Sequence, residues 1–302
     1  MTAVSSEPAS AQNSSRVVEG SVGLAALAGL YAESLGRLRA SRHLRVSLVR
    51  WSALGLILCA AISIPVAALV SASTAAWAVL GALLWSATVT AVLLGGASML
   101  VTPDGQHIDY YGLPNGLTAL RAYSCFPLIL YAALPLAGDT GLYFFCVVGS
   151  AAGSLDLVDG WIARRYGPLT ELGKALDPLG DAVFFSVGAV GCVLVGIIPA
   201  WLGGVMVFRY AAPLVATPVV FLLRRRPELV HTEWGRRNTL YTGGVLFVCM
   251  IVRLAGGPVQ VPAIVLGIPL LVTTTLLHFA TLWRRVLEAP VVRPSRRDRR
   301  TS

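Results

Sequence analysis

Charged residues are scarce in this chain. Asp, Glu, Lys and Arg make up 13% of its 302 residues, whereas 56% are hydrophobic. A soluble domain carries roughly twice that charged fraction. The stretch from Ala53 to Val101 contains no charged residue at all. Water therefore cannot be the main solvent of this chain, and the composition predicts a protein embedded in a lipid bilayer.

The chain also has few residues that bind soft metals. Its four histidines and five cysteines do not occur at the spacings of metal sites. Every cysteine lies in an apolar run, which indicates small buried hydrophobic side chains rather than disulfides. These cysteines are Cys59, Cys125, Cys146, Cys192 and Cys249.

The net charge of +9 does not indicate nucleic-acid binding. The basic residues lie at the edges of apolar runs, and the Arg-rich C-terminal tail has no interleaved aromatic residues. Attraction to anionic lipid headgroups explains both the tail and the stretch from Arg37 to Arg50. Membrane lipids are therefore expected partners, and nucleic acid is not.

Apolar runs long enough to cross a bilayer as helices recur along the chain. Eight are predicted, so the fold class is all-α integral membrane protein, with two N-terminal spans before a six-helix core. The predicted spans are Ala53–Val70, Ala75–Val101, Leu117–Ala137, Leu142–Leu155, Ala182–Ile198, Leu202–Leu223, Leu240–Val252 and Val261–Trp283.

The basic residues predict the orientation, because short cytoplasmic segments are enriched in Lys and Arg. With the N-terminus inside, the cytoplasmic segments hold 21 of the 24 basic residues. The other three, Arg121, Arg209 and Arg253, fall within apolar segments. We expect a multi-pass protein of the cell membrane with both termini in the cytoplasm.

Four regions follow from these patterns. Residues 1–50 are expected to form a cytoplasmic tail, which ends in an amphipathic segment with leucines at helical spacing after Leu24. Residues 51–101 form a two-helix extension, 102–285 the catalytic core, and 286–302 a basic cytoplasmic tail. The first two spans carry no chemically suggestive residue, so the function is assigned to the core.

Four aspartates lie within 26 residues at the edges of two predicted spans. Asp156 and Asp159 are three positions apart, and Asp177 and Asp181 are four apart, so each pair shares a face if its segment is helical. A connection of some 15 residues, containing Gly160 and Gly173, is expected to let the two segments form an antiparallel hairpin. The pairs would then face each other.

Converging carboxylates in a medium of low dielectric constant repel each other unless cations neutralise them. Oxygen ligands without His or Cys suit hard ions, and Mg²⁺ is favoured where phosphates complete the coordination shell. The pattern therefore indicates a site for two Mg²⁺ or Mn²⁺ ions that acts on a diphosphate.

The run from Asp156 to Asp181 resembles the signature of the CDP-alcohol phosphotransferases, D-x2-D-G-x2-A-R-x8-G-x3-D-x3-D, at every fixed position. Its remaining fixed residues are Gly160, Ala163, Arg164 and Gly173. A second stretch, Pro114 to Arg121, is similar to the P-N-x-L-T-x-x-R opening of the first core helix in that family. Two motifs at correct spacing make a chance match improbable.

The resemblance implies that an alcohol attacks the β-phosphorus of a CDP-linked donor and that CMP leaves. It implies that Asp156, Asp159, Asp177 and Asp181 hold two divalent ions and that Asp181 is also the general base. Gly160, Ala163 and Gly173 would let the cytidine approach the helix backbones, and Arg164 would pair with the donor diphosphate. Asn115, Thr118 and Thr170 are further expected donor contacts. The resemblance also implies a homodimer.

The sequence leaves the substrates open. An active site at the membrane edge favours CDP-diacylglycerol as donor, and the arginines within and beside the membrane favour glycerol 3-phosphate or an inositol phosphate as acceptor. A neutral alcohol, an amino alcohol or a second lipid fits the same motif. An intramembrane-carboxylate cation transporter and a catalytically inactive homologue are the alternative functions, since acidic residues in membranes also mark ion pathways.

Overall fold

The computed structural model describes residues 24–166, 169–222 and 233–288. These parts are almost entirely helical and contain no β-strand. The predicted all-α class is therefore confirmed. The helices are α2 (Leu24–Ala40), α3 (Arg42–Val70), α4 (Ala72–Gly95), η1 (Gly96–Met99), α5 (Leu113–Ala133), α6 (Thr140–Tyr166), α7 (Glu171–Leu194), α8 (Ala200–Leu222), α9 (Glu233–Leu254), α10 (Gln260–Pro262), η2 (Ala263–Val272) and α11 (Thr273–Glu288).

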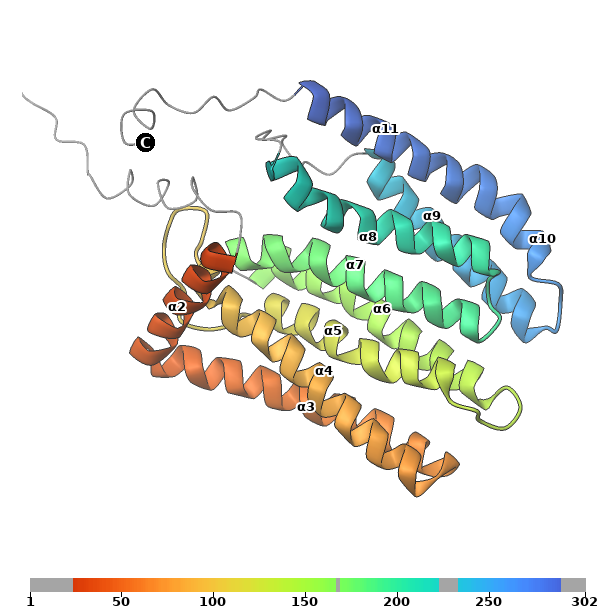
Figure 1. Cartoon of the computed structure of the whole chain (residues 1–302), viewed down its shortest axis with the longest axis horizontal. Coiled ribbons are helices and arrows are strands. Elements are labelled where there is room, and N and C mark those ends of the chain that lie inside the picture. The colour runs from red at the N-terminus through yellow and green to blue at the C-terminus, as the bar shows by residue number, and fades with distance from the viewer. Residues whose placement is uncertain (1–23, 167–168, 223–232, 289–302) are drawn as a thin grey trace, which may run out of the picture.

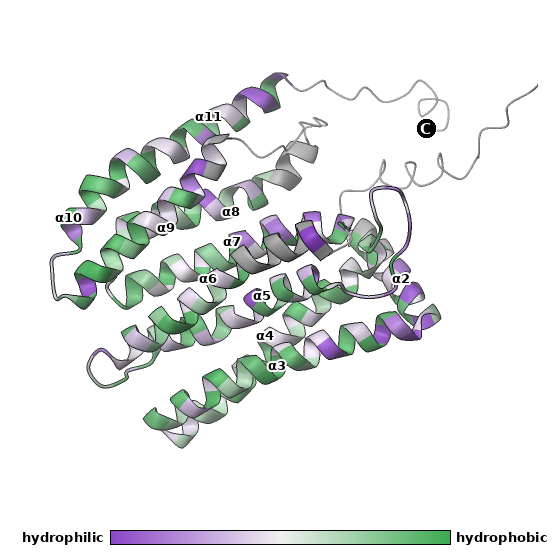
Figure 2. Ribbon diagram, turned by 180° about the vertical axis from the view of Figure 1, so that it is seen from behind, coloured by the Kyte–Doolittle hydropathy of each residue, from purple (hydrophilic) through white to green (hydrophobic). Residues whose placement is uncertain are grey.

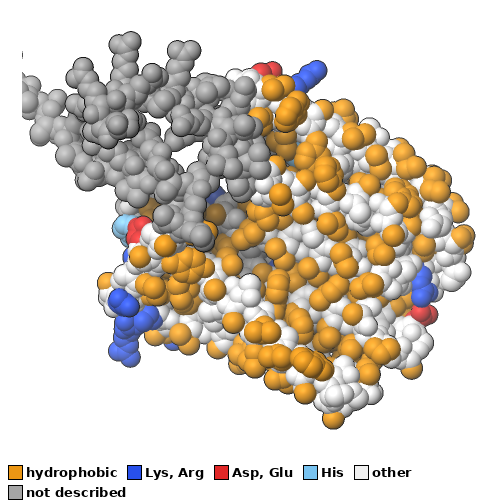
Figure 3. Space-filling model, in the orientation of Figure 1, with side chains coloured by type: hydrophobic (Ala, Val, Ile, Leu, Met, Phe, Trp, Pro, Cys, Tyr) orange, Lys and Arg blue, Asp and Glu red, His pale blue; other side chains and the backbone are white. Residues whose placement is uncertain are grey.

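Helices α3 to α11 lie roughly parallel or antiparallel to one another, and α2 crosses one end of the bundle (Figure 1). Hydrophobic residues occupy the middle of the helices, whereas hydrophilic residues gather towards the end that carries α2 (Figure 2). On the face seen in Figure 3, hydrophobic side chains cover the centre and charged ones lie at the edges. This distribution matches a bilayer with water on both sides.

Every predicted span overlaps a helix, but the count of eight is not settled by helix length and composition. Among the described residues, five segments are long and apolar enough to cross a membrane: Arg42–Val70, Ala72–Met99, Leu113–Ala133, Glu171–Leu194 and Gln260–Glu288. Two more apolar stretches, Thr140–Leu155 and Ala200–Ala216, are shorter. The structure thus supports an integral membrane protein, and eight spans remain a prediction.

The predicted hairpin connection between the aspartate pairs was too long. Helix α6 continues through Asp156 and Asp159 to Tyr166, and α7 begins at Glu171. The predicted span ended before the first charged residue, whereas the backbone hydrogen bonds of the helix continue beyond it. Thr170 caps α7, because its Oγ1 accepts the N–H of Gly173 at 3.1 Å. All four aspartates therefore belong to helices.

Arg37 on α2 joins the N-terminal extension to the start of the core. Its guanidinium donates to the carbonyl oxygens of Ala97 at 2.7 Å and Ile108 at 3.1 Å, with longer bonds to those of Ser98 and Leu100 at 3.4 Å. Asp109 lies 3.6 Å from it. One side chain thus satisfies carbonyls of the connection between α4 and α5, from Ala97 to Ile108.

That connection also contacts α7. The N–H of Glu171 donates to the carbonyl of Val101 at 3.0 Å, and a Cβ on Gly96 would collide with Leu172. Leu172 lies in a buried cluster with Leu44, Leu93 and Leu100 of the extension. The helix that carries Asp177 and Asp181 therefore begins on a platform built by residues 34–111.

Replacing Arg37 with Ala is expected to destabilise the protein by about 2 kcal/mol, because several partly buried carbonyls lose their donor. Thermal or denaturant unfolding of the purified protein in detergent measures the change. Arg39→Ala is the matched control, since Arg39 is exposed on the same helix. Equal losses in the two variants would show that the Arg37 bonds contribute nothing specific.

Candidate active site

Two motif residues, Asn115 and Gly173, meet Thr170 where α5 and α7 begin. The Asn115 Nδ2 donates to Thr170 Oγ1 at 3.3 Å, and the same oxygen caps α7 through the N–H of Gly173. A Cβ on Gly173 would lie 3.0 Å from Asn115 Oδ1, a tighter contact than side chains normally accept. Glycine at this position therefore permits the close approach of the two helices.

The next turns of α5 continue the contact. Asn115, Thr118 and Arg121 are spaced by three residues and are all buried, so they lie along one face of the helix. A Cβ on Gly180 would lie 3.3 Å from Thr118 Cγ2 and 3.4 Å from Arg121 Nη2. The face of α5 that carries the motif residues is thus pressed against α7.

Arg121 forms an ion pair with Asp181. Its Nη2 lies 2.8 Å from Asp181 Oδ1, and its guanidinium carbon lies 5.6 Å from the centre of the Phe184 ring. The Arg121 side chain is 2% exposed, whereas that of Asp181 is 37% exposed. The cationic side of the pair is therefore buried within the bundle, whereas the carboxylate is partly exposed. The sequence had marked Arg121 as an arginine in an apolar segment without assigning it a partner.

Asp177 lies one helical turn before Asp181 on α7 and is exposed. The spacing of four residues puts both carboxylates on one side of the helix, nearer to the end of the bundle that carries α2. Asp181 is half-buried and Asp177 is exposed, so exposure to solvent increases along α7 towards the polar end of the bundle.

Five further residues of the signature belong to the final turns of α6: Asp156, Asp159, Gly160, Ala163 and Arg164. Their side chains lie outside the described residues, so their predicted roles are not tested. For Asp156 and Asp159, the structure therefore gives only their place in the α6 helix. Phe145 packs on Gly191, and Gly153 lies 4.0 Å from Phe184 when a Cβ is added. Both contacts are made by aromatic rings, and the extensive packing of α6 is against α5.

The predicted face-to-face arrangement of the two aspartate pairs stays a prediction, because the side chains of Asp156 and Asp159 lie outside the described residues. The structure shows that α6, which carries these two residues, ends at Tyr166 and that α7, which carries Asp177 and Asp181, begins at Glu171.

This arrangement fits hard divalent cations. Asp177 and Asp181 supply carboxylate oxygens, and a carboxylate can accept a bond from Arg121 and still bind a cation through its other lone pairs. Among the side chains that the structure describes, no group of three or more Asp, Glu, His or Cys residues gathers. The two remaining predicted ligands are not among those side chains.

Arg209 on α8 is a second buried arginine beside α7. It is 8% exposed, its guanidinium carbon lies 5.2 Å from the centre of the Tyr210 ring, and it interacts electrostatically with Asp181. Tyr210 stacks on Phe185 at 4.4 Å. The Nε of Arg209 has no hydrogen-bond partner in the described structure, which is costly in a buried site. Its place within an apolar run was the signal available from the sequence.

Comparisons with known proteins agree with the motifs. The family model for CDP-alcohol phosphatidyltransferase matches residues 111–283. A CDP-diacylglycerol--glycerol-3-phosphate 3-phosphatidyltransferase from Rickettsia bellii is 39% identical over 85 residues, 28% of this chain and 42% of that protein. A probable phosphatidylglycerophosphate synthase from Mycobacterium tuberculosis is 27% identical over 110 residues, 36% of this chain and 50% of that protein.

A cardiolipin synthase (CMP-forming) from Streptomyces coelicolor is 33% identical over 115 residues, which cover 37% of this chain and 52% of that protein. The chain spans about half the length of the curated relatives that it matches. No solved structure matches it. The family match begins at residue 111, after helices α2 to α4.

The Arg121–Asp181 pair predicts a non-additive effect on stability. Arg121→Met and Asp181→Asn each leave a charged group without its partner, whereas the double variant leaves neither. The double variant should therefore be more stable than the sum of the two single losses predicts, by about 1 kcal/mol, since solvent screens the exposed carboxylate. Unfolding of all four proteins in detergent measures this coupling, and strictly additive losses would contradict the pairing.

Proposed function

Because the chain belongs to the CDP-alcohol phosphatidyltransferase family, we propose that it transfers a phosphatidyl group from CDP-diacylglycerol to an acceptor alcohol and releases CMP. The reaction would be a step of phospholipid synthesis. The observation that carries this proposal is the ion pair between Arg121 and Asp181, which joins residues of the two motifs across α5 and α7 within the matched range.

In this proposal Asp156, Asp159, Asp177 and Asp181 hold two Mg²⁺ or Mn²⁺ ions. When bound, such ions neutralise charge that develops on the diphosphate. Asp181 accepts the proton of the acceptor hydroxyl, which increases the nucleophilicity of the oxygen that attacks the β-phosphorus. The bond from Arg121 favours the ionised carboxylate, which is the form that accepts a proton.

The other motif residues are assigned to the donor. Asn115, Thr118 and Thr170 line the contact between α5 and α7 and would bind the CDP moiety. Gly173 keeps this contact close. Gly160 and Ala163 would leave room for the cytidine along α6, and Arg164 would pair with the diphosphate. These assignments rest on the motif and on the observed convergence of Asn115, Thr170 and Gly173.

Arg209 supports a phosphorylated acceptor. A buried guanidinium with an unsatisfied Nε, within electrostatic range of Asp181, has the charge and the donors that a phosphate requires. Glycerol 3-phosphate is our first candidate, because the name of the Rickettsia bellii relative contains it; an inositol phosphate has the same anionic group. The similarity to cardiolipin synthases makes a lipid alcohol the second candidate.

The remaining proposals concern topology and assembly. Eight membrane spans, both termini and the active site in the cytoplasm, and a homodimer are consistent with the distribution of basic residues and with the family. The catalytic core would comprise residues 102–285, close to the matched range of 111–283. Residues 1–50, 51–101 and 286–302 would be the N-terminal tail, the extension and the basic tail.

Incubation of the purified full-length protein with Mg²⁺, CDP-diacylglycerol and glycerol 3-phosphate should release CMP and form a new phospholipid, both measurable by chromatography. Asp181→Asn should lower the rate at least about 100-fold, because it removes the general base and a cation ligand. Phosphatidylglycerol and an inositol phosphate serve as alternative acceptors in parallel reactions.

Glu171→Gln is the matched control, because Glu171 is an exposed acidic residue on the same helix, paired with Lys174. It should retain nearly full activity. If no acceptor gives CMP, or if Asp181→Asn is as active as the control, the proposed reaction is wrong. A transporter or an inactive homologue would then be the better explanation.

Arg209→Gln should raise the KM for glycerol 3-phosphate about tenfold or more while the KM for CDP-diacylglycerol changes little, because a charge-assisted bond to the acceptor phosphate is lost. Steady-state kinetics with each substrate varied in turn measures both. Arg253→Gln is the control, since Arg253 pairs with Asp139 in another part of the bundle. A KM that is unchanged for both substrates would remove Arg209 from the acceptor site.

A further inference from the structure

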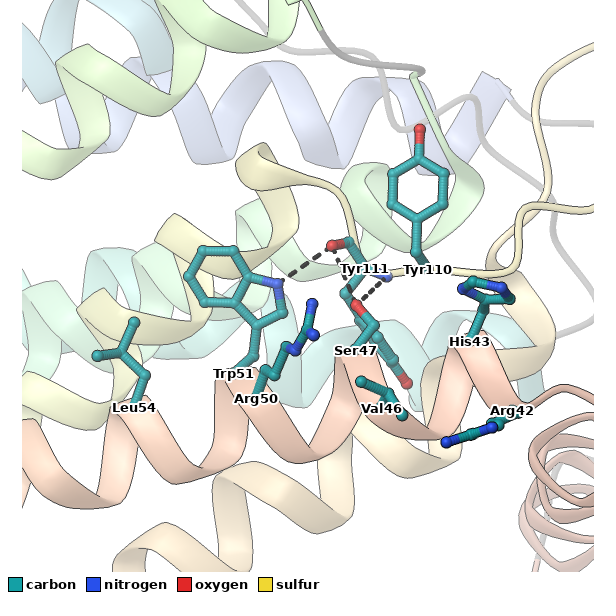
Figure 4. Close-up of a pocket in the computed structure, with 9 residues that line it drawn as sticks. All are labelled: Arg42, His43, Val46, Ser47, Arg50, Trp51, Leu54, Tyr110 and Tyr111. Carbon is teal, nitrogen blue, oxygen red and sulfur yellow. Dashed lines mark hydrogen bonds between the residues drawn. The ribbon is translucent and has the colours of Figure 1, made fainter.

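A cavity of about 700 Å³ lies between α3 and the segment that leads into α5, outside the aspartate site (Figure 4). One wall is a single face of α3, whose members recur at helical spacing. The other wall is Tyr110 and Tyr111. The residues from α3 are Arg42, His43, Val46, Ser47, Arg50, Trp51 and Leu54.

The floor of this cavity is held by hydrogen bonds. The Ser47 Oγ accepts the N–H of Tyr111 at 2.9 Å, and Trp51 Nε1 donates to the carbonyl of Tyr111 at 3.1 Å. The Tyr111 side chain is buried, and its hydroxyl donates to the carbonyl of Leu93 at 2.6 Å. The cavity is therefore built by the fold rather than left by a loose loop.

The rim is basic. Arg50 lies beside Trp51 towards one end, and Arg42 and His43 lie towards the other (Figure 4). Within the described part of the chain, no acidic residue lines the cavity, and neither Arg42 nor Arg50 has an ion pair or a side-chain hydrogen bond. Two exposed guanidiniums that face a cavity without a carboxylate favour an anionic ligand.

The wall formed by α3 is apolar at Val46 and Leu54, and this apolar surface continues into the membrane-spanning part of α3. Val46 is 37% exposed, Leu54 47% and Ile57 64%. From Ala53 onwards α3 carries no charged residue. Trp51 and Tyr110 lie at the transition, where aromatic residues mark the boundary between headgroups and hydrocarbon. A ligand here meets positive charge at one end and an acyl-chain environment at the other.

We propose that this cavity binds the headgroup of an anionic phospholipid, with the phosphate at Arg42, His43 and Arg50 and an acyl chain along Val46, Leu54 and Ile57. The apolar wall selects a lipid over a free phosphate, because a soluble anion would leave that surface unused. The site is independent of the reaction proposed above, since none of its residues belongs to the aspartate signature.

Occupancy has a structural consequence for the core. A Cβ on Gly116 would collide with the ring of Trp51, so the cavity wall packs directly against the first turn of α5. Asn115, the neighbouring residue, donates to Thr170 at the start of α7. A bound lipid therefore stabilises the wall on which α5 begins, and it should raise the unfolding midpoint by mass action.

The test compares lipid binding by the full-length protein in detergent, using native mass spectrometry with phosphatidylglycerol or phosphatidylcholine of the same chain length. The double variant Arg42→Gln/Arg50→Gln should bind phosphatidylglycerol about tenfold or more weakly than the wild type, because two basic contacts are lost. The wild type should bind phosphatidylcholine much more weakly than phosphatidylglycerol. Its unfolding midpoint should rise only with the anionic lipid.

Arg39→Gln/Arg284→Gln is the matched control, because it removes the same charge from two exposed positions outside the cavity. It should retain wild-type affinity. Phosphatidylglycerol with brominated acyl chains should also quench the tryptophan fluorescence of the wild type more than that of Trp51→Phe. This difference would place the lipid beside Trp51. Equal losses in the two double variants, equal binding of both lipids, or displacement by inorganic phosphate alone would overturn the proposal.

Discussion

The contact between α5 and α7 is the constraint on which the site depends. Two polar bonds fix it at separate levels: Asn115 to Thr170 where both helices begin, and Arg121 to Asp181 deeper in the bundle. A buried guanidinium requires a counterion, and this requirement sets the distance and the rotation of α7 relative to α5. The glycines at 173 and 180 allow it, since a larger residue at either position would crowd α5.

Helix α5 contacts α6 as well as α7, so it also positions the other helix of the hairpin. Helix α6 packs mainly against α5 and touches α7 through Phe145 and Gly191, and only a short connection separates its end at Tyr166 from the start of α7 at Glu171. The polar chemistry is thereby concentrated at one end of a bundle whose middle is hydrophobic (Figure 2). A reaction between a lipid-linked donor and a water-soluble acceptor requires a site at such a boundary.

The sequence predicted the helical class, and each predicted span overlaps a helix of the structure, because apolar runs and local periodicity are readable from the residues alone. It was wrong about the connection after Asp159, since charged residues ended the predicted span while the helix continued to Tyr166. It left Arg121 without a partner, although the spacing of Asn115, Thr118 and Arg121 already placed them on one face. The sequence did not predict the Arg37 bonds. Their acceptors are backbone carbonyls some 60 residues away, and every residue has such a carbonyl, so the side-chain pattern does not identify them.

The platform under α7 has a consequence for the order in which the chain is made. Residues 34–111 are synthesised before Glu171, so the carbonyl of Val101 that receives its N–H belongs to a segment that Arg37 already holds. Chains emerge and fold from the N-terminus onward. The extension is therefore synthesised in full before the helix that packs on it, so the surface that receives the first turn of α7 can form first.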